Sequence, residues 1–416
     1  MVSTRTTSSD GPILGGMLGF LVGASAMFAT MYSTQAVLPT IGDSFGISPS
    51  RAGLTISVLV LALVVGSWIW GPLSDRIGRR RCLLAACALQ VPATVAVAVA
   101  PTFGLLLAGR IAQGLIMPGL LVVGLPYVAQ VFVPAIGVRA VGWYTVSLIV
   151  GGLVGRLGVA FASSVIGWRG ALAVLALFPL AALVVMARGL PAAAARHRVA
   201  ETGRFITRRI AAATLTGPAV YFIFVGVFTF IGYRLESAPF SRSPTAVSFV
   251  FVAWVMGAVA PFAGARSERV GWAPVAAAGI VSAAAGVAMT VSGHLTAIVA
   301  GLVLVTLGMF IVVTAAPIGI STARGVRAAR ASSVYYSVYY SAGALGAFLP
   351  GLAWQAFGWD GVAATCGIAV AVATAGAVLG LIDGGGGGRG LRRVEPVTVR
   401  QVGVGVGRPL RYSGSR

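Results

Sequence analysis

The chain contains little charge and no lysine. Only 9% of its 416 residues are charged, nine are acidic, and all thirty basic residues are arginines. Soluble domains carry roughly a quarter charged residues, so this composition excludes a soluble protein. The net charge of +21 does not indicate nucleic-acid binding, because no charged segment is long enough to fold into a soluble binding domain.

Cysteines and the residues of catalytic sites are also scarce. Of the three cysteines, Cys82 and Cys87 lie where one hydrophobic run begins, and Cys366 lies in a distant run. This arrangement argues against a disulfide framework and against a zinc site. No nucleophile–base pair or cluster of metal ligands is recognisable. We therefore expect no enzyme activity, no bound metal and no cofactor.

Long hydrophobic runs dominate the chain instead. Hydrophobic residues make up 58% of it, the mean hydropathy is +0.95, and about twelve runs can each cross a bilayer. Each crossing segment must be a helix, because unpaired backbone amides are too costly in hydrocarbon. The sequence therefore predicts an all-α membrane protein with twelve transmembrane helices. The predicted spans are 13–39, 50–72, 82–100, 103–128, 138–165, 170–188, 212–233, 245–264, 273–292, 295–318, 331–352 and 360–382.

The longest polar connection divides these runs into two sets of six. Segment 189–211 is basic, with five arginines. We predict a cytoplasmic tail (1–12), a first six-helix half (13–188), this basic linker, a second half (212–382) and a Gly/Arg-rich tail (383–416). The last segment cannot bury a core, so we expect it to be disordered.

The arginines predict the orientation in the membrane. If both termini are cytoplasmic, 24 arginines fall on the tails and inner loops. Loops that face the cytoplasm carry an excess of basic residues, so we predict cytoplasmic termini and the lipid bilayer as a partner. Four arginines would fall on outer loops, namely Arg51, Arg169, Arg234 and Arg242.

The two sets of runs also match each other. Shifts of 193 and 191 residues superimpose an acidic–Arg–x–Gly motif and a Gly-Trp-x-Gly motif. Two halves in parallel repeat are typical of secondary carriers, whose site lies between the halves near mid-membrane. We therefore predict pseudo-symmetric halves. The matched pairs are Gly71 with Gly264, Asp75 with Glu268, Arg76 with Arg269, Gly78 with Gly271, Gly167 with Gly358, and Trp168 with Trp359.

The loop between the second and third runs carries a longer motif. Residues 71–80 read Gly-Pro-Leu-Ser-Asp-Arg-Ile-Gly-Arg-Arg, which resembles the signature of the major facilitator superfamily. Residues 110–114 in the fourth run resemble the RxxQG motif of that family, and 32–39 and 232–235 resemble its bacterial drug and arabinose-efflux-permease branch. The resemblance implies a twelve-helix transporter that works by alternating access.

The same resemblance implies a conformational latch in this loop. Asp75 would hold the two halves together in the outward-closed state, near the start of the eleventh helix, whose positive end favours a carboxylate. Arg80 and Arg81 are expected to face lipid and set the topology, and Trp168 and Trp359 are expected to be interfacial anchors. The predicted latch residues are Gly71, Asp75, Arg76, Gly78 and Arg79, with a degenerate repeat copy at Glu268 and Arg269.

Two arginines, Arg110 and Arg156, lie well away from the ends of the predicted spans. An arginine in hydrocarbon is costly unless it faces a partner or a wet cavity, so we predict that both line a cavity or take part in coupling. For Arg156 the alternatives are snorkelling to the outer surface and pairing with a backbone carbonyl. Further cavity candidates are Gln35, Gln113, Tyr144, Tyr233 and Tyr335, although any one of these tyrosines also fits an interface anchor.

No acidic residue lies within the hydrocarbon part of a predicted span, and the nearest candidates are Asp43 and Glu236, which also fit exposed loop acids. A cavity with two arginines and no acid favours a neutral or anionic substrate over a cation. We predict proton-coupled export of a small organic compound by a monomer in the bacterial inner membrane. The alternatives are an uptake symporter or facilitator and, less favoured, a non-transporting receptor or scaffold.

Overall fold

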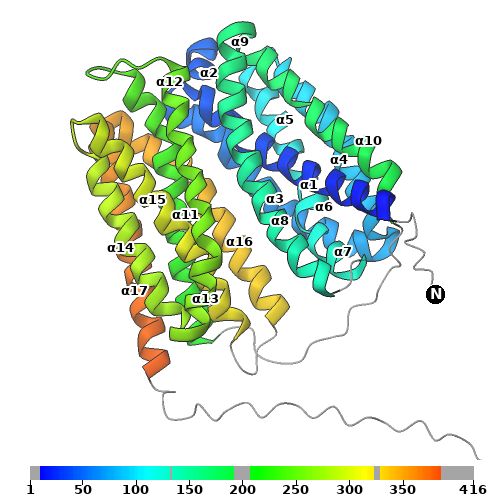
Figure 1. The fold of residues 1–416 in the computed structure, drawn as a ribbon. Helices are drawn as coiled ribbons and strands as arrows, with labels where there is room; N and C mark the ends of the chain where they lie inside the picture. Colours follow the sequence, from blue (N-terminus) through cyan, green and yellow to red (C-terminus); the bar gives the residue numbers. More distant parts are fainter. Residues whose placement is uncertain (1–9, 132–133, 192–206, 323–327, 386–416) are drawn as a thin grey trace, which may run out of the picture.

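The protein folds into two neighbouring groups of helices. The computed structural model describes residues 10–131, 134–191, 207–322 and 328–385, where every regular element is helical. Figure 1 shows the helices before residue 191 beside those after residue 207. Most of the predicted linker and tails lies outside the described residues.

The first group contains α1 (Asp10–Tyr32), η1 (Ser33–Val37), α2 (Leu38–Phe45), α3 (Pro49–Ile77), α4 (Arg79–Ala98), α5 (Phe103–Ile116), α6 (Pro118–Leu121), α7 (Gly124–Val131), α8 (Pro134–Leu153), η2 (Val154–Gly158), α9 (Val159–Leu175) and α10 (Leu177–Gly189). The second group contains α11 (Arg208–Glu236), α12 (Pro244–Ser248), η3 (Phe249–Val259), α13 (Ala260–Val270), α14 (Trp272–Thr290), α15 (Leu295–Ser321), α16 (Ala328–Gly346) and α17 (Leu349–Gly385).

Ten stretches of the described residues are long and apolar enough to cross a membrane. Two of them, Trp143–Gly189 and Ala331–Asp383, contain 47 and 53 residues, about twice what one crossing needs. Each is interrupted by a glycine with non-helical backbone angles, Gly167 in the first and Gly358 in the second. Counting each of these two stretches as two passes gives the predicted twelve.

Single glycines join neighbouring helices at equivalent places in the two groups. Gly78 alone connects α3 to α4, and Gly271 alone connects α13 to α14. Their φ angles are 90° and 91°, a region that a residue with a Cβ rarely adopts. The glycine N–H donates to the carbonyl of Ser74 in the first joint and of Ser267 in the second. The predicted repeat therefore holds in geometry as well as in sequence.

The tryptophans after the two helix breaks are buried. The expectation that Trp168 and Trp359 are interfacial anchors is wrong, because only 5% and 6% of their surfaces are exposed. The indole N–H of Trp168 donates to the hydroxyl of Ser44 at 3.0 Å, and that of Trp359 donates to the hydroxyl of Thr290 at 3.2 Å. Each tryptophan thus fastens a helix break to a neighbouring helix of its own group.

Two irregular turns interrupt the helices that build the centre of the bundle. The chain passes from α1 through the 3-10 helix η1 into α2, where Pro39 has no N–H to donate to the carbonyl of Gln35. In the other break, α8 passes into the π-helical turn η2, which contains Arg156. Such turns are frequent at functional sites, and here they position Gln35 and Arg156.

Contacts between the two groups are found at the end of the bundle where α3 begins. The hydroxyl of Ser57 donates to the carbonyl of Ala344 at 2.7 Å. Gly53 lies so close to the turn after α16 that a Cβ there would clash with the carbonyl oxygen of Ala347. At about 1.5 Å per residue, Ser57 is roughly 30 Å along α3 from Gly78. We call this end the opposite end, and the end with the Gly78 and Gly271 joints the arginine-rich end.

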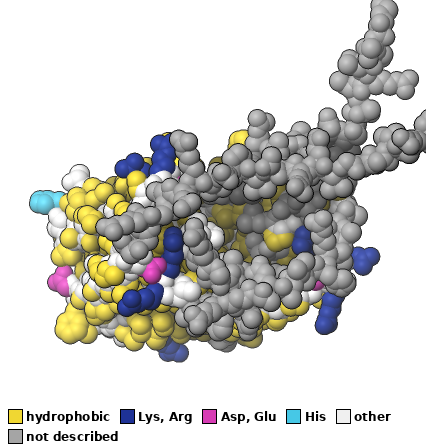
Figure 2. Space-filling model, turned by 90° about the horizontal axis from the view of Figure 1, so that it is seen from below, with side chains coloured by type: hydrophobic (Ala, Val, Ile, Leu, Met, Phe, Trp, Pro, Cys, Tyr) yellow, Lys and Arg dark blue, Asp and Glu magenta, His cyan; other side chains and the backbone are white. Residues whose placement is uncertain are grey.

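The arginine-rich end carries a rim of exposed cations. Figure 2 looks onto this end and shows dark blue arginine side chains around its edge. We predict that this end faces the cytoplasm. The exposed, described arginines there are Arg76, Arg81, Arg188, Arg208, Arg266 and Arg269.

The glycine joints give a test of the fold. Alanine at position 78 would have to hold a φ near 90°, a strain of about 1–3 kcal/mol, so Gly78→Ala should lower the Tm of the detergent-purified protein, measured by thermal unfolding. Gly71→Ala is the matched control, because a Cβ there meets no atom within 4 Å. Equal Tm values for the two variants would contradict the role of the joint.

Candidate functional site

Arg110 is fully buried on α5, and each of its three nitrogens is hydrogen-bonded. Its Nε donates to the carbonyl of Thr55 on α3 at 2.7 Å. Its Nη1 donates to the carbonyl of Thr30 at 2.8 Å and to Oε1 of Gln113 at 3.0 Å, and its Nη2 donates to the carbonyl of Met31 at 2.7 Å. These acceptors on α1 lie where the α-helical pattern gives way to η1.

Arg110 therefore ties together α1, α3 and α5, which all belong to the first group. The side chain of Gln113 extends the network to α4, because its amide donates to the hydroxyl of Thr94 at 3.1 Å. The two candidates from the RxxQG motif thus lie together. Both residues are hydrogen-bonded to other groups of the first half. This arrangement does not support the prediction that they line a cavity.

Arg156 is also fully buried, but its hydrogen bonding is incomplete. Its Nε donates to Oε1 of Gln35 at 2.8 Å, and its Nη1 donates to the carbonyl of Gly152 at 2.9 Å. Its Nη2 has no partner. The guanidinium carbon lies 4.3 Å from the ring centres of both Tyr32 and Trp254, a cation–π geometry. Since Trp254 belongs to η3, Arg156 lies where the two groups meet.

Two hydrogen bonds next to Arg156 also cross between the groups. The amide of Gln35 donates to the hydroxyl of Thr229 at 3.1 Å, and the hydroxyls of Tyr32 and Tyr221 are hydrogen-bonded to each other. Thr229 and Tyr221 both lie on α11. No more than 3% of any of these side chains is exposed. We call the following residues the central cluster: Tyr32, Gln35, Arg156, Tyr221, Thr229 and Trp254.

The three candidate tyrosines lie away from this cluster. The hydroxyl of Tyr144 donates to the carbonyl of Leu121 at 3.0 Å, within the first group. The hydroxyl of Tyr233 donates to the carbonyl of Leu38 at 3.2 Å, between the groups. Tyr335 is fully buried in the second group, and its hydroxyl has no partner among the described residues. Of the predicted cavity candidates, Gln35 alone is hydrogen-bonded to Arg156.

The predicted latch residues lie at the arginine-rich end. Arg79 donates to the carbonyl of Pro126 on α7 at 2.8 Å, and Asp75 is partly exposed. Glu268 and Arg269 are exposed on α13. The predicted partner segment at the start of the eleventh helix includes residues 323–327, which lie outside the described part of the chain. The latch therefore stays a prediction.

Arg80 differs from what the sequence suggests. The expectation that it faces lipid is wrong, because its Nε donates to the carbonyl of Leu190 at 2.7 Å and its Nη2 to that of Ala187 at 2.9 Å. These carbonyls lie at the C-terminal end of α10, where a cation is favoured by the free carbonyls and the helix dipole. Arg80 thus fastens α4 to α10.

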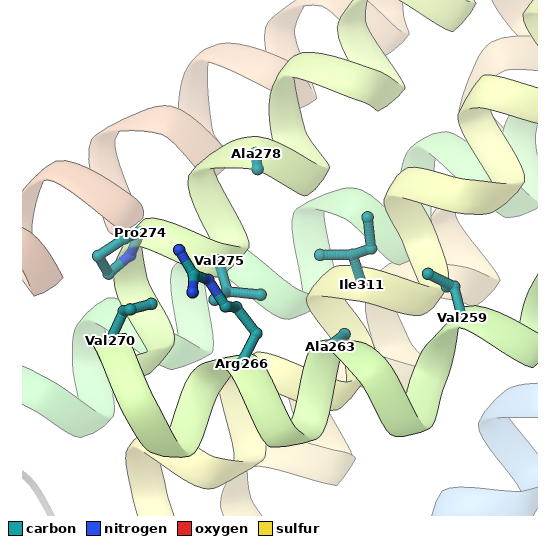
Figure 3. Close-up of a pocket in the computed structure, with 8 residues that line it drawn as sticks. All are labelled: Val259, Ala263, Arg266, Val270, Pro274, Val275, Ala278 and Ile311. Carbon is teal, nitrogen blue, oxygen red and sulfur yellow. The ribbon is translucent and has the colours of Figure 1, made fainter.

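Two surface cavities lie away from the central cluster. One of about 370 Å³ lies between α13, α14 and α15, where the side chain of Arg266 lies over an apolar groove (Figure 3). The other, of about 300 Å³, lies between α1, α8 and α10. Neither is lined by a central-cluster residue or by a predicted site residue. The central cluster itself is closed in this conformation, because no more than 3% of any of its side chains is exposed.

Reasoning from the sequence missed four members of the central cluster. Tyr32 begins the segment 32–39 that carries part of the resemblance, so a signal for it was present. Tyr221, Thr229 and Trp254 are ordinary residues of hydrophobic runs, where aromatic side chains and single hydroxyls are common. Their importance appears only when η3 and α11 of the second group are placed against Arg156.

Comparison with known proteins gives a family and a fold. The family described as Major Facilitator Superfamily matches residues 18–347. The Escherichia coli protein named "Inner membrane transport protein YnfM" is 31% identical over 360 residues, which cover 84% of this chain and 86% of the relative. The Bacillus subtilis protein named "Uncharacterized MFS-type transporter YybF" is 25% identical, with 80% and 85% covered.

Solved structures of transporters share the fold. A bacterial homologue of the human lysosomal transporter Spinster, in an inward-facing and unoccupied conformation, has a TM-score of 0.73 at 15% identity, with 89% of this chain and 97% of that chain covered. A D-xylose–proton symporter has a TM-score of 0.69 at 15% identity, with the same coverage. At this identity the likeness concerns the fold alone.

The two buried arginines should respond differently to loss of their charge. Arg110→Gln leaves buried carbonyls without donors, at about 1–3 kcal/mol for each unsatisfied group, so it should lower the Tm by several degrees. Arg156→Gln removes a buried charge that is only partly bonded, so the Tm should change little or rise. Thermal unfolding of both variants in one detergent tests this. If Arg156→Gln lowers the Tm as much as Arg110→Gln does, the proposed difference between the two arginines in their contribution to stability is wrong.

Proposed function

The chain belongs to the Major Facilitator Superfamily, and on that premise we propose that this membrane transporter exports small organic compounds in exchange for protons. The observation that carries the proposal is the central cluster, in which a buried arginine lies at the contact between two pseudo-symmetric groups of helices. Carriers of this architecture bind substrate between their halves and open alternately to either side. The moving units we propose are the halves 13–188 and 212–382.

The contacts between the halves favour one end state of this cycle. Ser57 and Ala344 meet at the opposite end, as do Ser50 and Gln355. With the arginine-rich end predicted to face the cytoplasm, this conformation is closed towards the outside. The resemblance assigned the latch to the outward-closed state. We propose instead that Asp75, Arg76 and Arg79 meet the second half in the other end state, because they lie at the arginine-rich end, away from the contacts at the opposite end.

A carboxylate at the opposite end is our candidate for proton coupling. The acidic residues with described exposure are all at least partly exposed, and Glu236 is one of the less exposed among them. Glu236 ends α11, less than one turn after Tyr233, whose hydroxyl bonds to Leu38 of the first half. Asp43 on α2 interacts electrostatically with it across the same contact. A proton taken up here would reduce repulsion between the halves and favour closure of this end.

We further propose a location in the bacterial inner membrane, cytoplasmic termini and a monomeric unit. The name of the E. coli relative, an inner membrane transport protein, supports the location. An uptake symporter or a facilitator would use the same fold. The direction of solute movement in proteoliposomes with a pH gradient distinguishes these alternatives from an exporter.

Proteoliposome transport with an imposed pH gradient tests the proposed exchange. Solute should move against its concentration gradient when protons flow the other way, and Glu236→Gln should remove the response to the gradient. Asp360→Asn is the matched control, because that carboxylate is exposed and does not join the halves. Solute movement in the same direction as protons would identify a symporter, and movement that ignores the gradient would identify a facilitator.

Cross-linking tests the rocking of the halves. The Ser50→Cys/Gln355→Cys pair, joined by a short bifunctional thiol reagent, should hold the opposite end closed and stop transport. The Arg209→Cys/Thr322→Cys pair lies within the second group of helices, where the two wild-type side chains are hydrogen-bonded at 3.0 Å. Its cross-link should leave transport intact. Full activity with the Ser50–Gln355 pair joined would contradict alternating access at this contact.

A further inference from the structure

Arg156 carries a positive charge that the described protein does not neutralise. Its side chain is fully buried, and the acids whose exposure is described are all at least partly exposed. Its two hydrogen bonds go to uncharged acceptors, the amide oxygen of Gln35 and the carbonyl of Gly152. A buried cation without a counter-ion is costly in hydrocarbon. The site therefore lacks an anion that would neutralise Arg156.

Two hydrogen-bond donors of the central cluster also lack acceptors. Nη2 of Arg156 and Nε1 of Trp254 are both buried and both without a partner. Arginine and the indole N–H can only donate, so neither group can satisfy the other. Buried donors without partners are rare and costly. What the site lacks is an acceptor, and the charge of Arg156 favours an acceptor that is anionic.

The surroundings of these donors are aromatic. The guanidinium carbon of Arg156 lies 4.3 Å from the ring centres of Tyr32 and Trp254 and 5.1 Å from that of Phe251. Phe28 and Phe224 pack against Trp254 in turn, with ring centres 6.2 and 5.3 Å away. Such walls fit a flat apolar body, because aromatic rings pack well edge-to-face or offset against one another.

Arg110 provides an internal comparison. It is buried to the same extent, yet each of its nitrogens has an acceptor from the protein. Burial alone therefore does not leave an arginine incomplete in this fold. Of the two fully buried arginines among the described residues, the one at the contact between the halves is the one that lacks an acceptor.

From these observations we infer that the transported compound is an aromatic carboxylate, held by its carboxylate at Nη2 of Arg156 and Nε1 of Trp254. This inference rests on the proposed transport function and names its substrate class. A carboxylate offers two oxygens to two donors and neutralises the guanidinium. Because the central cluster is closed here, the ligand enters when the halves move apart, and its ring then takes a place among the side chains around Trp254.

Ligand binding to the purified full-length protein tests the inference. Thermal unfolding would be followed with benzoate and indole-3-acetate, with the corresponding amides benzamide and indole-3-acetamide, and with sodium chloride and phosphate. We expect both carboxylates to raise the Tm and both amides to bind at least tenfold more weakly. Equal stabilisation by the amides, stabilisation by inorganic anions only, or no stabilisation by either carboxylate would overturn the inference.

Variants connect the binding to Arg156. Arg156→Gln should weaken carboxylate binding at least tenfold, and Trp254→Phe, which keeps a ring but removes the N–H, should weaken it by a smaller factor. Arg266→Gln is the matched control, because it makes the same change at an exposed arginine. If Arg156→Gln binds benzoate as tightly as the wild type, the assignment of the site is wrong.

Transport in proteoliposomes separates this inference from the proposed function. If vesicles accumulate or release neutral or cationic compounds but ignore aromatic acids, the substrate class is wrong and the transport function stands. If carboxylates bind in an Arg156-dependent way but no solute moves under any gradient, the transport function is wrong and the binding site stands.

Discussion

A guanidinium buried in hydrocarbon needs an acceptor for its N–H groups, and much of this structure follows from how two arginines meet that need. Arg110 finds its acceptors in backbone carbonyls of α1 and α3 and in Gln113, so it fixes the packing of the first half. Arg156 finds only two. All three nitrogens of Arg110 are hydrogen-bonded within the first half, whereas Nη2 of Arg156 has no acceptor in the described part of the chain.

The repeat in the sequence predicted the architecture well because it records backbone geometry. Gly78 and Gly271 have nearly identical φ angles, as their matched positions suggest. The difference between Arg110 and Arg156 was not predictable in the same way. It depends on where α1 gives way to η1, which frees acceptors for one arginine, and on which residues of η3 and α11 face the other. Neither feature leaves a pattern in a uniformly hydrophobic sequence.

Other errors share one cause, which is that a residue type has several roles in a membrane. Arg80 was expected to face lipid because basic residues near a bilayer surface usually do, yet it binds carbonyls at the end of α10. Trp168 and Trp359 were expected to be interfacial anchors, but both follow a helix break and are buried and hydrogen-bonded. In each case a specific neighbour decided the role, and neighbours across the fold cannot be read from local sequence.

The joints at Gly78 and Gly271 have a mechanical consequence. Each connects two helices through a single residue. Because the connection is so short, one helix cannot slide along the membrane normal past the helix to which it is joined. Any change of shape must carry α3 with α4, and α13 with α14, as stiff pairs at constant depth. In the proposed transport cycle, each joint would therefore make its two helices tilt together with the half to which they belong.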